Sequence, residues 1–196
     1  MITTTLSFAN LHNHGELFAN MLRARRELFI VHNKWDLPQA LGMEYDQYDT
    51  PASRWVVVHD DQGRVLAGNR LTPTTAKCGI YSYMIRDAQL GCLETIPANL
   101  LYQPAPIGDH IWESSRLFVA HDVPASIRRR VHAQLIQQLG ETVRSRNATH
   151  CLTLWAATWP RWADRVGVKM RAMGPVMEID GVENQVVEMD FSLTVH

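Results

Sequence analysis

A short acidic and aromatic segment carries the residue types that acid–base chemistry needs. The six residues from Glu44 to Asp49, Glu-Tyr-Asp-Gln-Tyr-Asp, hold three carboxylates and two tyrosines. Glu44 and Asp46 would share one face of an extended segment, because side chains alternate along an extended chain. Carboxylates so placed can accept a proton from a substrate amine, directly or through water. Taken alone, the hexapeptide favours the alternative of an ordinary solvated acidic loop.

Arginines, aromatic rings and a further carboxylate accompany this segment along the chain. Two downstream blocks stand out: Gly68–Thr74, which reads Gly-Asn-Arg-Leu-Thr-Pro-Thr, and Ile111–Phe118, which reads Ile-Trp-Glu-Ser-Ser-Arg-Leu-Phe. The charged and aromatic residues added by these blocks and by the upstream sequence are Arg25, Phe29, Trp35, Asp36, Arg70, Glu113 and Arg116. These surroundings favour a functional site over a solvated loop.

The order of these residues resembles that of the LuxI-type autoinducer synthases. It runs Arg, Phe, Trp-Asp, Glu-x-Asp-x-Tyr-Asp, Arg-Leu-x-x-Thr and a final Trp-Glu-x-Ser-Arg-Phe-like block. The resemblance is strong from Leu22 to Phe118 and looser elsewhere, and such an ordered set is far more specific than any one motif. It implies a fold similar to that of the GNAT acetyltransferases.

The resemblance also implies an enzyme that joins an acyl thioester to S-adenosylmethionine and releases an acyl-homoserine lactone, methylthioadenosine and a free thiol. The acyl donor would be an acyl carrier protein or acyl-CoA. S-adenosylmethionine would be a substrate, with no metal and no other cofactor. Its α-amine must lose a proton before it attacks the thioester, and Glu44, Asp46 and Glu113 are the candidate bases. Its carboxylate then attacks its own γ-carbon, a step helped by holding the ligand folded.

Further roles follow from the same resemblance. Arg25, Phe29 and Trp35 would belong to the part of the chain that closes over S-adenosylmethionine, where an aromatic face beside the sulfonium contributes about 0.5–2 kcal/mol. Arg70 and Arg116 are expected to pair with Asp46, Asp49 or Glu113, because unpaired buried charges are costly. For Arg70 and Asp49 a purely structural ion network is equally open. The expected substrate-binding set is Arg25, Phe29, Trp35, Asp46 and Arg70, and the expected catalytic set is Glu44, Asp46, Asp49, Glu113, Arg25, Arg70 and Arg116.

Two strands bear on the acyl side of the reaction. Alternation along Ile111–Ala120 aims Glu113 at the central cleft and turns Trp112 into the core. The expected acyl pocket consists of Met84, Trp155 and Ala156. Family members acting on 3-oxo chains often place Thr on this second strand, where this chain has Trp155 and Ala156, so the pocket is expected to lack the hydroxyl that would bond a 3-oxo group. The bulk of Trp155 separately predicts a pocket for a short, branched or aryl acyl group. A position of Trp155 in the outer core is equally open.

The apolar pattern predicts an α/β sandwich that positions these groups. A strand–helix–strand crossover between 111 and 157 implies parallel pairing. With the resemblance, the prediction is a GNAT-like three-layer sandwich in one domain, residues 1–196, with a mixed, largely antiparallel central sheet flanked by helices. The expected strands are Ile2–Phe8, Arg54–His59, Arg64–Leu71, Ile111–Ala120, His150–Ala157, Met177–Ile179 and Gln185–Leu193; the expected helices run from Leu17 to near Asn33, Pro124–Arg146 and Pro160–Val166; Lys34–Ser53 is expected to be a long loop.

Composition excludes several other classes of protein. With 46% hydrophobic and 20% charged residues the chain is expected to fold, and its net charge of -1 excludes a globally basic nucleic-acid-binding protein. Three cysteines without a C-x-x-C pair, no signal peptide and no long apolar stretch predict a cytoplasmic protein without membrane insertion. The stretch from Arg116 to Arg171 contains ten basic residues and three acidic ones, so an acidic carrier protein could bind there. The alternative is that these basic residues simply form the solvated surface of a helix.

Two other functions are also compatible with the sequence. A CoA-dependent GNAT N-acyltransferase would cradle pyrophosphate on a Gly-rich loop at a helix start, but Arg128–Ala133 contains no glycine. A non-catalytic ligand-binding module on the same fold is the second rival. The His12-Asn13-His14 sequence lacks the third ligand that a metal site needs.

Overall fold

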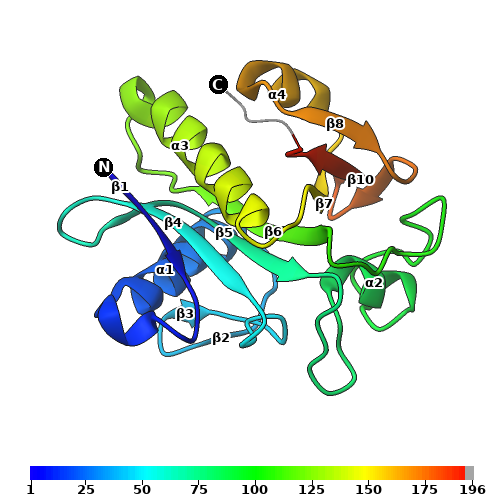
Figure 1. Ribbon diagram of the computed structural model, residues 1–196, viewed down its shortest axis with the longest axis horizontal. Helices are drawn as coiled ribbons and strands as arrows, with labels where there is room; N and C mark the ends of the chain where they lie inside the picture. The colour runs from blue at the N-terminus through cyan, green and yellow to red at the C-terminus, as the bar shows by residue number, and fades with distance from the viewer. Residues whose placement is uncertain (193–196) are drawn as a thin grey trace. The chain divides into compact units, whose positions relative to one another are not determined.

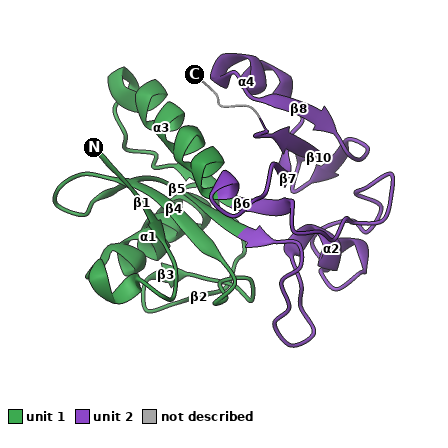
Figure 2. Ribbon diagram, in the orientation of Figure 1, with its two compact units in different colours: residues 1–71, 116–142 green, residues 72–115, 143–196 purple. Residues whose placement is uncertain are grey.

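The computed structural model describes residues 1–192 and divides the chain into two compact units (Figures 1 and 2). Unit 1 consists of residues 1–71 and 116–142, and unit 2 consists of residues 72–115 and 143–196. The expectation of a single domain over residues 1–196 stays a prediction. Among the described residues no helix is long and apolar enough to cross a membrane.

Unit 1 is a sheet with a helix on each face. Its strands follow the order β1-β4-β5-β6, and β1 pairs with β4, and β4 with β5, in antiparallel fashion. Trp55 and Val57 pack with α1, whereas Thr3 and Thr5 of β1 bond to Gln138 and Thr142 of α3. The elements are β1 (Ile2–Leu6), η1 (Leu11–Asn13), α1 (Leu17–Arg26), the π-helical segment η2 (Glu27–His32), β2 (Gln39–Ala40), β3 (Met43–Glu44), β4 (Arg54–His59), β5 (Val65–Pro73), β6 (Ile111–Val119) and α3 (Ala125–Arg144), of which β5, β6 and α3 each also contribute residues to unit 2.

The core of unit 1 explains why α1 lies on this sheet. The apolar side chains of α1 are spaced so that Leu17, Met21 and Leu22 share one face, and all three are buried against the strands. Gly68 of β5 admits the ring of Phe118, because a Cβ built there would lie 2.7 Å from the ring atom Cε1. The close approach of β5 and the Phe118 ring therefore requires glycine at this position.

Unit 2 is a second sheet segment of mixed direction, with strand order β6-β7-β10-β8 and β9 paired to β10. Ile111–Glu113 of β6 run parallel to His150–Leu152 of β7, and the remaining pairs are antiparallel. Asp180 and Gly181 both have positive φ, 51° and 76°, as a tight hairpin turn of mirror-image type requires. The elements are α2 (Met84–Gln89), β7 (His150–Ala156), α4 (Trp159–Val166), β8 (Lys169–Ala172), β9 (Met177–Ile179) and β10 (Val182–Asp190).

The structure confirms the predicted fold class and most of the predicted elements. The first helix continues through η2 to a C-cap at Asn33, and the parallel β6–β7 pairing is present. The differences are that the expected loop Lys34–Ser53 contains the β2–β3 hairpin and that η1, α2 and β8 were not predicted. Leu193, the expected end of the last strand, lies outside the described residues.

Candidate active site

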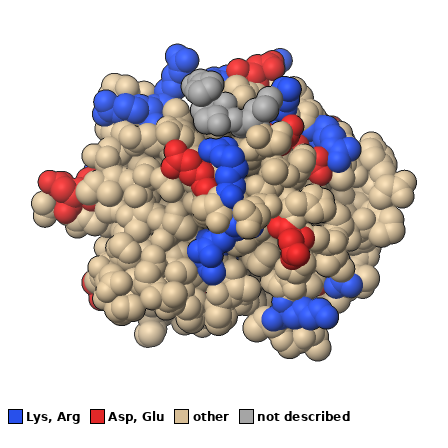
Figure 3. Space-filling model, in the orientation of Figure 1, with Lys and Arg blue, Asp and Glu red and all other residues tan. Residues whose placement is uncertain are grey.

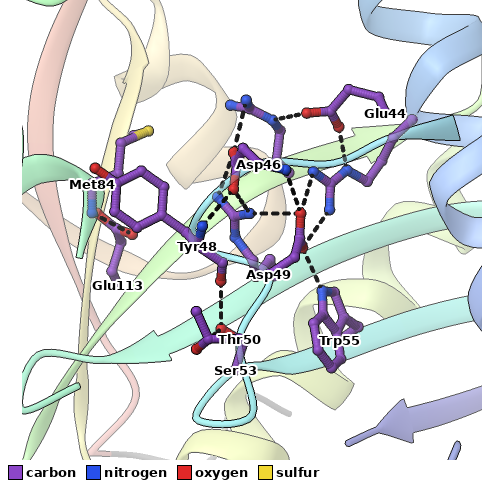
Figure 4. Close-up of polar contacts among 12 residues, drawn as sticks. Glu44, Asp46, Tyr48, Asp49, Thr50, Ser53, Trp55, Met84 and Glu113 are labelled. Carbon is purple, nitrogen blue, oxygen red and sulfur yellow. Dashed lines mark hydrogen bonds and ion pairs between the residues drawn. The ribbon is translucent and has the colours of Figure 1, made fainter. Parts of the chain in front are cut away.

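Six charged side chains form a closed ring inside unit 1 (Figure 4). Each carboxylate bridges two arginines, and each arginine bridges two carboxylates. The members are Arg25 of α1, Arg70 of β5, Arg116 of β6, Glu44 of β3, and Asp46 and Asp49 of the loop that follows β3. The structure therefore brings together all the predicted catalytic residues except Glu113, which belongs to unit 2.

Arg25 closes one side of this ion ring. Its Nε lies 2.5 Å from Glu44 Oε2, and its two Nη atoms lie 2.8 and 3.1 Å from the two carboxylate oxygens of Asp49. The contact with Asp49 is bidentate and needs the planar guanidinium group, which lysine lacks.

Arg70 and Arg116 close the other sides. Arg70 binds both oxygens of Asp46, and its Nη1 lies 3.1 Å from Asp49 Oδ2. Arg116 Nε lies 3.1 Å from Glu44 Oε1, and its Nη2 lies 3.0 Å from Asp46 Oδ2. The predicted pairing of both arginines with acidic residues of the hexapeptide is confirmed.

The ion ring is almost completely removed from solvent. Its side chains are between 0% and 12% exposed, and Arg116 is the most accessible. Burial alone would raise the pKa of Asp46, but Arg70 and Arg116 lower it, and Arg70 and Arg25 likewise hold the pKa of Asp49 below its usual range. Burial would lower the pKa of Arg25, yet Asp49 and Glu44 raise it. Arg25, Asp46 and Asp49 are therefore charged at neutral pH, and Asp46 and Asp49 are weak bases there.

Trp55 of β4 is a further member of the site that was not predicted from the sequence. Its indole Nε1 donates a hydrogen bond of 2.9 Å to Asp49 Oδ1, and the backbone N–H of Asp46 donates to Asp49 Oδ2 at 3.0 Å. Alternation along β4 places Trp55 on the α1 face, and a buried indole N–H requires an acceptor. The alternation of β4 and the need of a buried indole N–H for an acceptor could have identified Trp55 from the sequence.

Arg116 reaches the ring through an unusual backbone conformation. Its φ is +53° in the middle of β6, a left-handed conformation that costs a residue other than glycine roughly 1–2 kcal/mol. Its guanidinium is directed at Glu44 and Asp46. Strain of this kind is concentrated at functional sites.

Two aromatic rings flank the ion ring in unit 1. Phe29 and Trp35 are stacked with centroids 5.1 Å apart and planes 5° apart, and the Arg116 guanidinium lies 5.8 Å from the centroid of Phe29. Phe29 is 4% exposed, whereas Trp35 is 41% exposed. Trp35 therefore offers the more accessible aromatic surface, and binding of a sulfonium by either ring stays a prediction.

Glu113 is held by backbone groups of unit 2. Its carboxylate is fully buried and accepts hydrogen bonds from the N–H groups of Met84 and Ile85, at 3.2 and 2.8 Å, at the start of α2 (Figure 4). Trp112 is 6% exposed, as expected for a core residue.

The three expected acyl-pocket residues do not gather at one place in unit 2. Met84 and Leu154 pack against the hydrophobic cluster of this unit, which contains Leu152. Trp155 instead packs against Trp162 of α4, with centroids 4.5 Å apart and the rings tilted by 39°, and alternation puts it on the opposite face of β7 from Leu154. Ala156, at the end of β7, alternates onto the face of Leu154. The packing thus favours the core interpretation of Trp155.

Arg128, at the start of α3, is already engaged by backbone carbonyl groups, and Arg129 and Arg130 are exposed. Arg128 donates hydrogen bonds to the carbonyl groups of Val119 and Ala120, at 3.3 and 3.1 Å. On the face drawn in Figure 3, basic and acidic side chains lie in small neighbouring groups rather than in one basic surface. Within residues 1–192 no group of three or more His, Cys, Asp or Glu residues could hold a metal ion.

The fold and the ion ring together define an α/β protein with a buried, charge-balanced site. A family model described as autoinducer synthase matches residues 9–193. The chain belongs to the autoinducer synthase family. An acyl-homoserine-lactone synthase of Vibrio anguillarum is 26% identical over 159 residues, which cover 80% of this chain and 76% of that protein.

Solved structures agree with this assignment at the level of the fold. BjaI, a CoA-dependent acyl-homoserine lactone synthase solved with SAM and isopentyl-CoA, superposes with a TM-score of 0.77 at 21% identity, covering 97% of this chain and 83% of BjaI. An acyl-CoA N-acyltransferase from Pseudomonas aeruginosa gives a TM-score of 0.58 at 16% identity, covering 96% and 97% of the two chains. The GNAT-like fold class is therefore confirmed.

Proposed function

We propose that this protein is an acyl-homoserine-lactone synthase that makes a quorum-sensing signal. It transfers an acyl group from a thioester to the α-amine of S-adenosylmethionine and then closes the lactone. The observation that carries the proposal is the family match over residues 9–193. The ion ring supports it, because all six of its residues stand at family motif positions quoted from the sequence and all six meet in space.

The reaction has two balanced steps. The amine nitrogen attacks the thioester carbonyl, the C–S bond of the donor breaks, and the thiol leaves with the proton that the amine gives up. The methionyl carboxylate then attacks its own γ-carbon, the bond from that carbon to the sulfonium breaks, and neutral methylthioadenosine leaves. No metal or redox partner enters this balance, and S-adenosylmethionine is consumed as a substrate.

We assign the ion ring the task of binding and orienting S-adenosylmethionine. Its donors and acceptors are fixed before the ligand arrives, so little reorganisation is needed during the reaction. Because arginines lower the pKa of Asp46 and Asp49, these carboxylates suit a counter-ion to the ammonium group better than a direct base. A water molecule held by the ring would then take the proton, because Glu44 is likewise bound by two arginines. Trp35, stacked on Phe29, would face the sulfonium.

The acyl donor is an acyl carrier protein or acyl-CoA. Only the carrier protein needs a basic docking surface on the enzyme. Docking of an acidic carrier depends on exposed basic residues such as Arg129 and Arg130, since Arg128 is bonded to backbone carbonyls. Salt screens such contacts, so the KM for an acyl-carrier donor should rise with ionic strength more than the KM for S-adenosylmethionine. Equal salt dependence of the two constants would favour acyl-CoA. We propose a cytoplasmic location, where both donors occur.

Product analysis tests the proposal. The purified protein is incubated with S-adenosylmethionine and a panel of acyl-carrier and acyl-CoA thioesters, and products are identified by mass spectrometry. We expect an acyl-homoserine lactone together with methylthioadenosine. Acylation of another amine without methylthioadenosine would indicate a general N-acyltransferase, and binding without turnover would indicate a ligand-binding module.

A further inference from the structure

The start of α2 in unit 2 is held by two buried carboxylates. Asp87, within the helix, reaches back to Ser82: the Ser82 N–H donates to Oδ2 at 2.9 Å and the Ser82 hydroxyl donates to Oδ1 at 2.5 Å. Glu113, from β6, accepts the N–H groups of Met84 and Ile85. The two acidic residues are 1% and 0% exposed.

A helix as short as α2 needs such support. The first N–H groups of any helix lack partners within it, and a segment of six residues is too short to be stable alone. Glu113 satisfies two of these groups. Its own place is fixed by β6, where it stands opposite Leu152 in the parallel register with β7. The position of α2 is therefore coupled to the β6–β7 pair through one side chain.

The helix carries part of the apolar interior of unit 2. Ile85 and Ala88 are fully buried in its hydrophobic cluster, and three partly buried methionines, Met84, Met173 and Met177, pack against that cluster. Methionine side chains are flexible and adapt to irregular apolar shapes. An acyl chain that enters unit 2 would meet this surface.

We propose that Glu113 is a positioning residue that anchors α2 and thereby sets which acyl groups the enzyme accepts. Both of its oxygens are already engaged by backbone N–H groups in the structure. The inference rests on the proposed function for the identity of the ligand, an acyl thioester. It assigns Glu113 to the acyl donor rather than to deprotonation of the amine.

Two variants separate these roles. Glu113→Gln keeps the size of the side chain but replaces one acceptor oxygen by an NH2 group, which cannot accept a backbone N–H. Asp87→Asn disturbs the same helix start without touching Glu113. For both we expect amide hydrogen exchange in peptides covering 83–90 to accelerate about tenfold or more, the effect of losing one buried hydrogen bond. We also expect kcat/KM for the acyl donor to fall about tenfold with a changed chain-length profile, and the KM for S-adenosylmethionine to stay within about twofold.

The opposite pattern would overturn the proposal. In that case Glu113→Gln would abolish turnover with every donor while exchange at 83–90 matched the wild type, and Asp87→Asn would behave as the wild type. Failure of the proposed function is a distinct result, since the wild-type protein would then make no lactone. Exchange in the two variants still decides whether Glu113 anchors α2, and it does so without any activity measurement. Loss of folding in Glu113→Gln, seen by circular dichroism, leaves Asp87→Asn to decide.

Discussion

The indole N–H of Trp55 donates a hydrogen bond to Asp49 Oδ1 over 2.9 Å, and this bond links the hydrophobic core of unit 1 to the ion ring. Phe18 packs on the same indole with centroids 4.7 Å apart. Asp49 is in turn bound by Arg25 and Arg70. The geometry of the charged ring thus depends on a residue whose surroundings are otherwise apolar.

Trp55→Phe should weaken both stability and substrate binding. The ring remains but the donor is lost, and a hydrogen bond to a charged acceptor contributes about 1.5–3 kcal/mol. We expect the free energy of unfolding, measured in urea, to fall by that amount and the KM for S-adenosylmethionine to rise. The matched control is Phe18→Leu, which disturbs the same packing without the hydrogen bond and should lower stability alone. Identical KM values in the two variants would refute a role for the indole N–H.

Arg70→Lys should show that the ring needs guanidinium geometry rather than charge. Lysine retains the charge but cannot bind both oxygens of Asp46 while also reaching Asp49. Breaking a buried ion pair costs about 3–5 kcal/mol of stability, and Arg70→Lys should cost part of that, because the charge is kept. We expect kcat/KM for S-adenosylmethionine to fall at least about a hundredfold. Near-normal kinetics with lysine would mean that a positive charge is sufficient.

Arg116→Gly and Arg116→Ala should separate backbone strain from side-chain chemistry. Both variants lose the contacts to Glu44 and Asp46, so both should lose most activity. Glycine adopts a φ of +53° without strain, and we therefore expect the glycine variant to be about 1 kcal/mol more stable than the alanine variant. Equal stabilities would show that the backbone relaxes when the guanidinium is removed.

Acid should destabilise the protein through Asp46 and Asp49. Their pKa values are lower in the folded chain than in the unfolded chain, so the unfolded state binds more protons when the pH falls. Their contribution is fully present above the unfolded value of about 3.9 and is lost progressively below it. Urea unfolding between about pH 7 and pH 3 should show this decline, with a smaller slope in Asp49→Asn. An unchanged slope in the variant would contradict the assignment.

Trp155→Ala should cost stability without changing the product. Trp155 packs against Trp162 away from the face that carries Leu154. Truncating a core tryptophan costs about 3–5 kcal/mol, and the half-buried Trp155 should lose part of that stability. We expect a lower Tm and the same distribution of acyl chain lengths in the lactone. A shift toward longer or bulkier acyl groups would instead place Trp155 in the acyl pocket.

Much of the fold could be predicted because its strands alternate clearly or consist of β-branched runs. Val56–Val58 and the Asp180-Gly181 turn are examples, and the helix and strand that follow β6 predicted the parallel pair. The missed elements have weak local signals. β8 has four residues, Lys-Met-Arg-Ala, and α2 owes its start to Glu113, which lies 28 residues away from Ile85.

The members of the ion ring could be predicted, but not its topology. The hexapeptide and the two arginine motifs supplied the residue types. The alternation of three arginines with three carboxylates depends on the φ of Arg116 and on contacts between distant elements, such as Arg116 with Glu44 over 72 positions. Trp55 was missed because an indole on an apolar strand has the sequence pattern of a core residue.

The fate of S-adenosylmethionine tests the central claim most directly. The protein is given S-adenosylmethionine in which the carboxyl, α, β and γ carbons of the methionyl group carry 13C, together with an acyl thioester, and the lactone and methylthioadenosine are quantified by mass spectrometry. The account predicts lactone carrying the full 13C label and an equal molar amount of methylthioadenosine, with both lost together in Arg70→Lys. An acylated product that retains the sulfonium, or a lactone without the label, would contradict it.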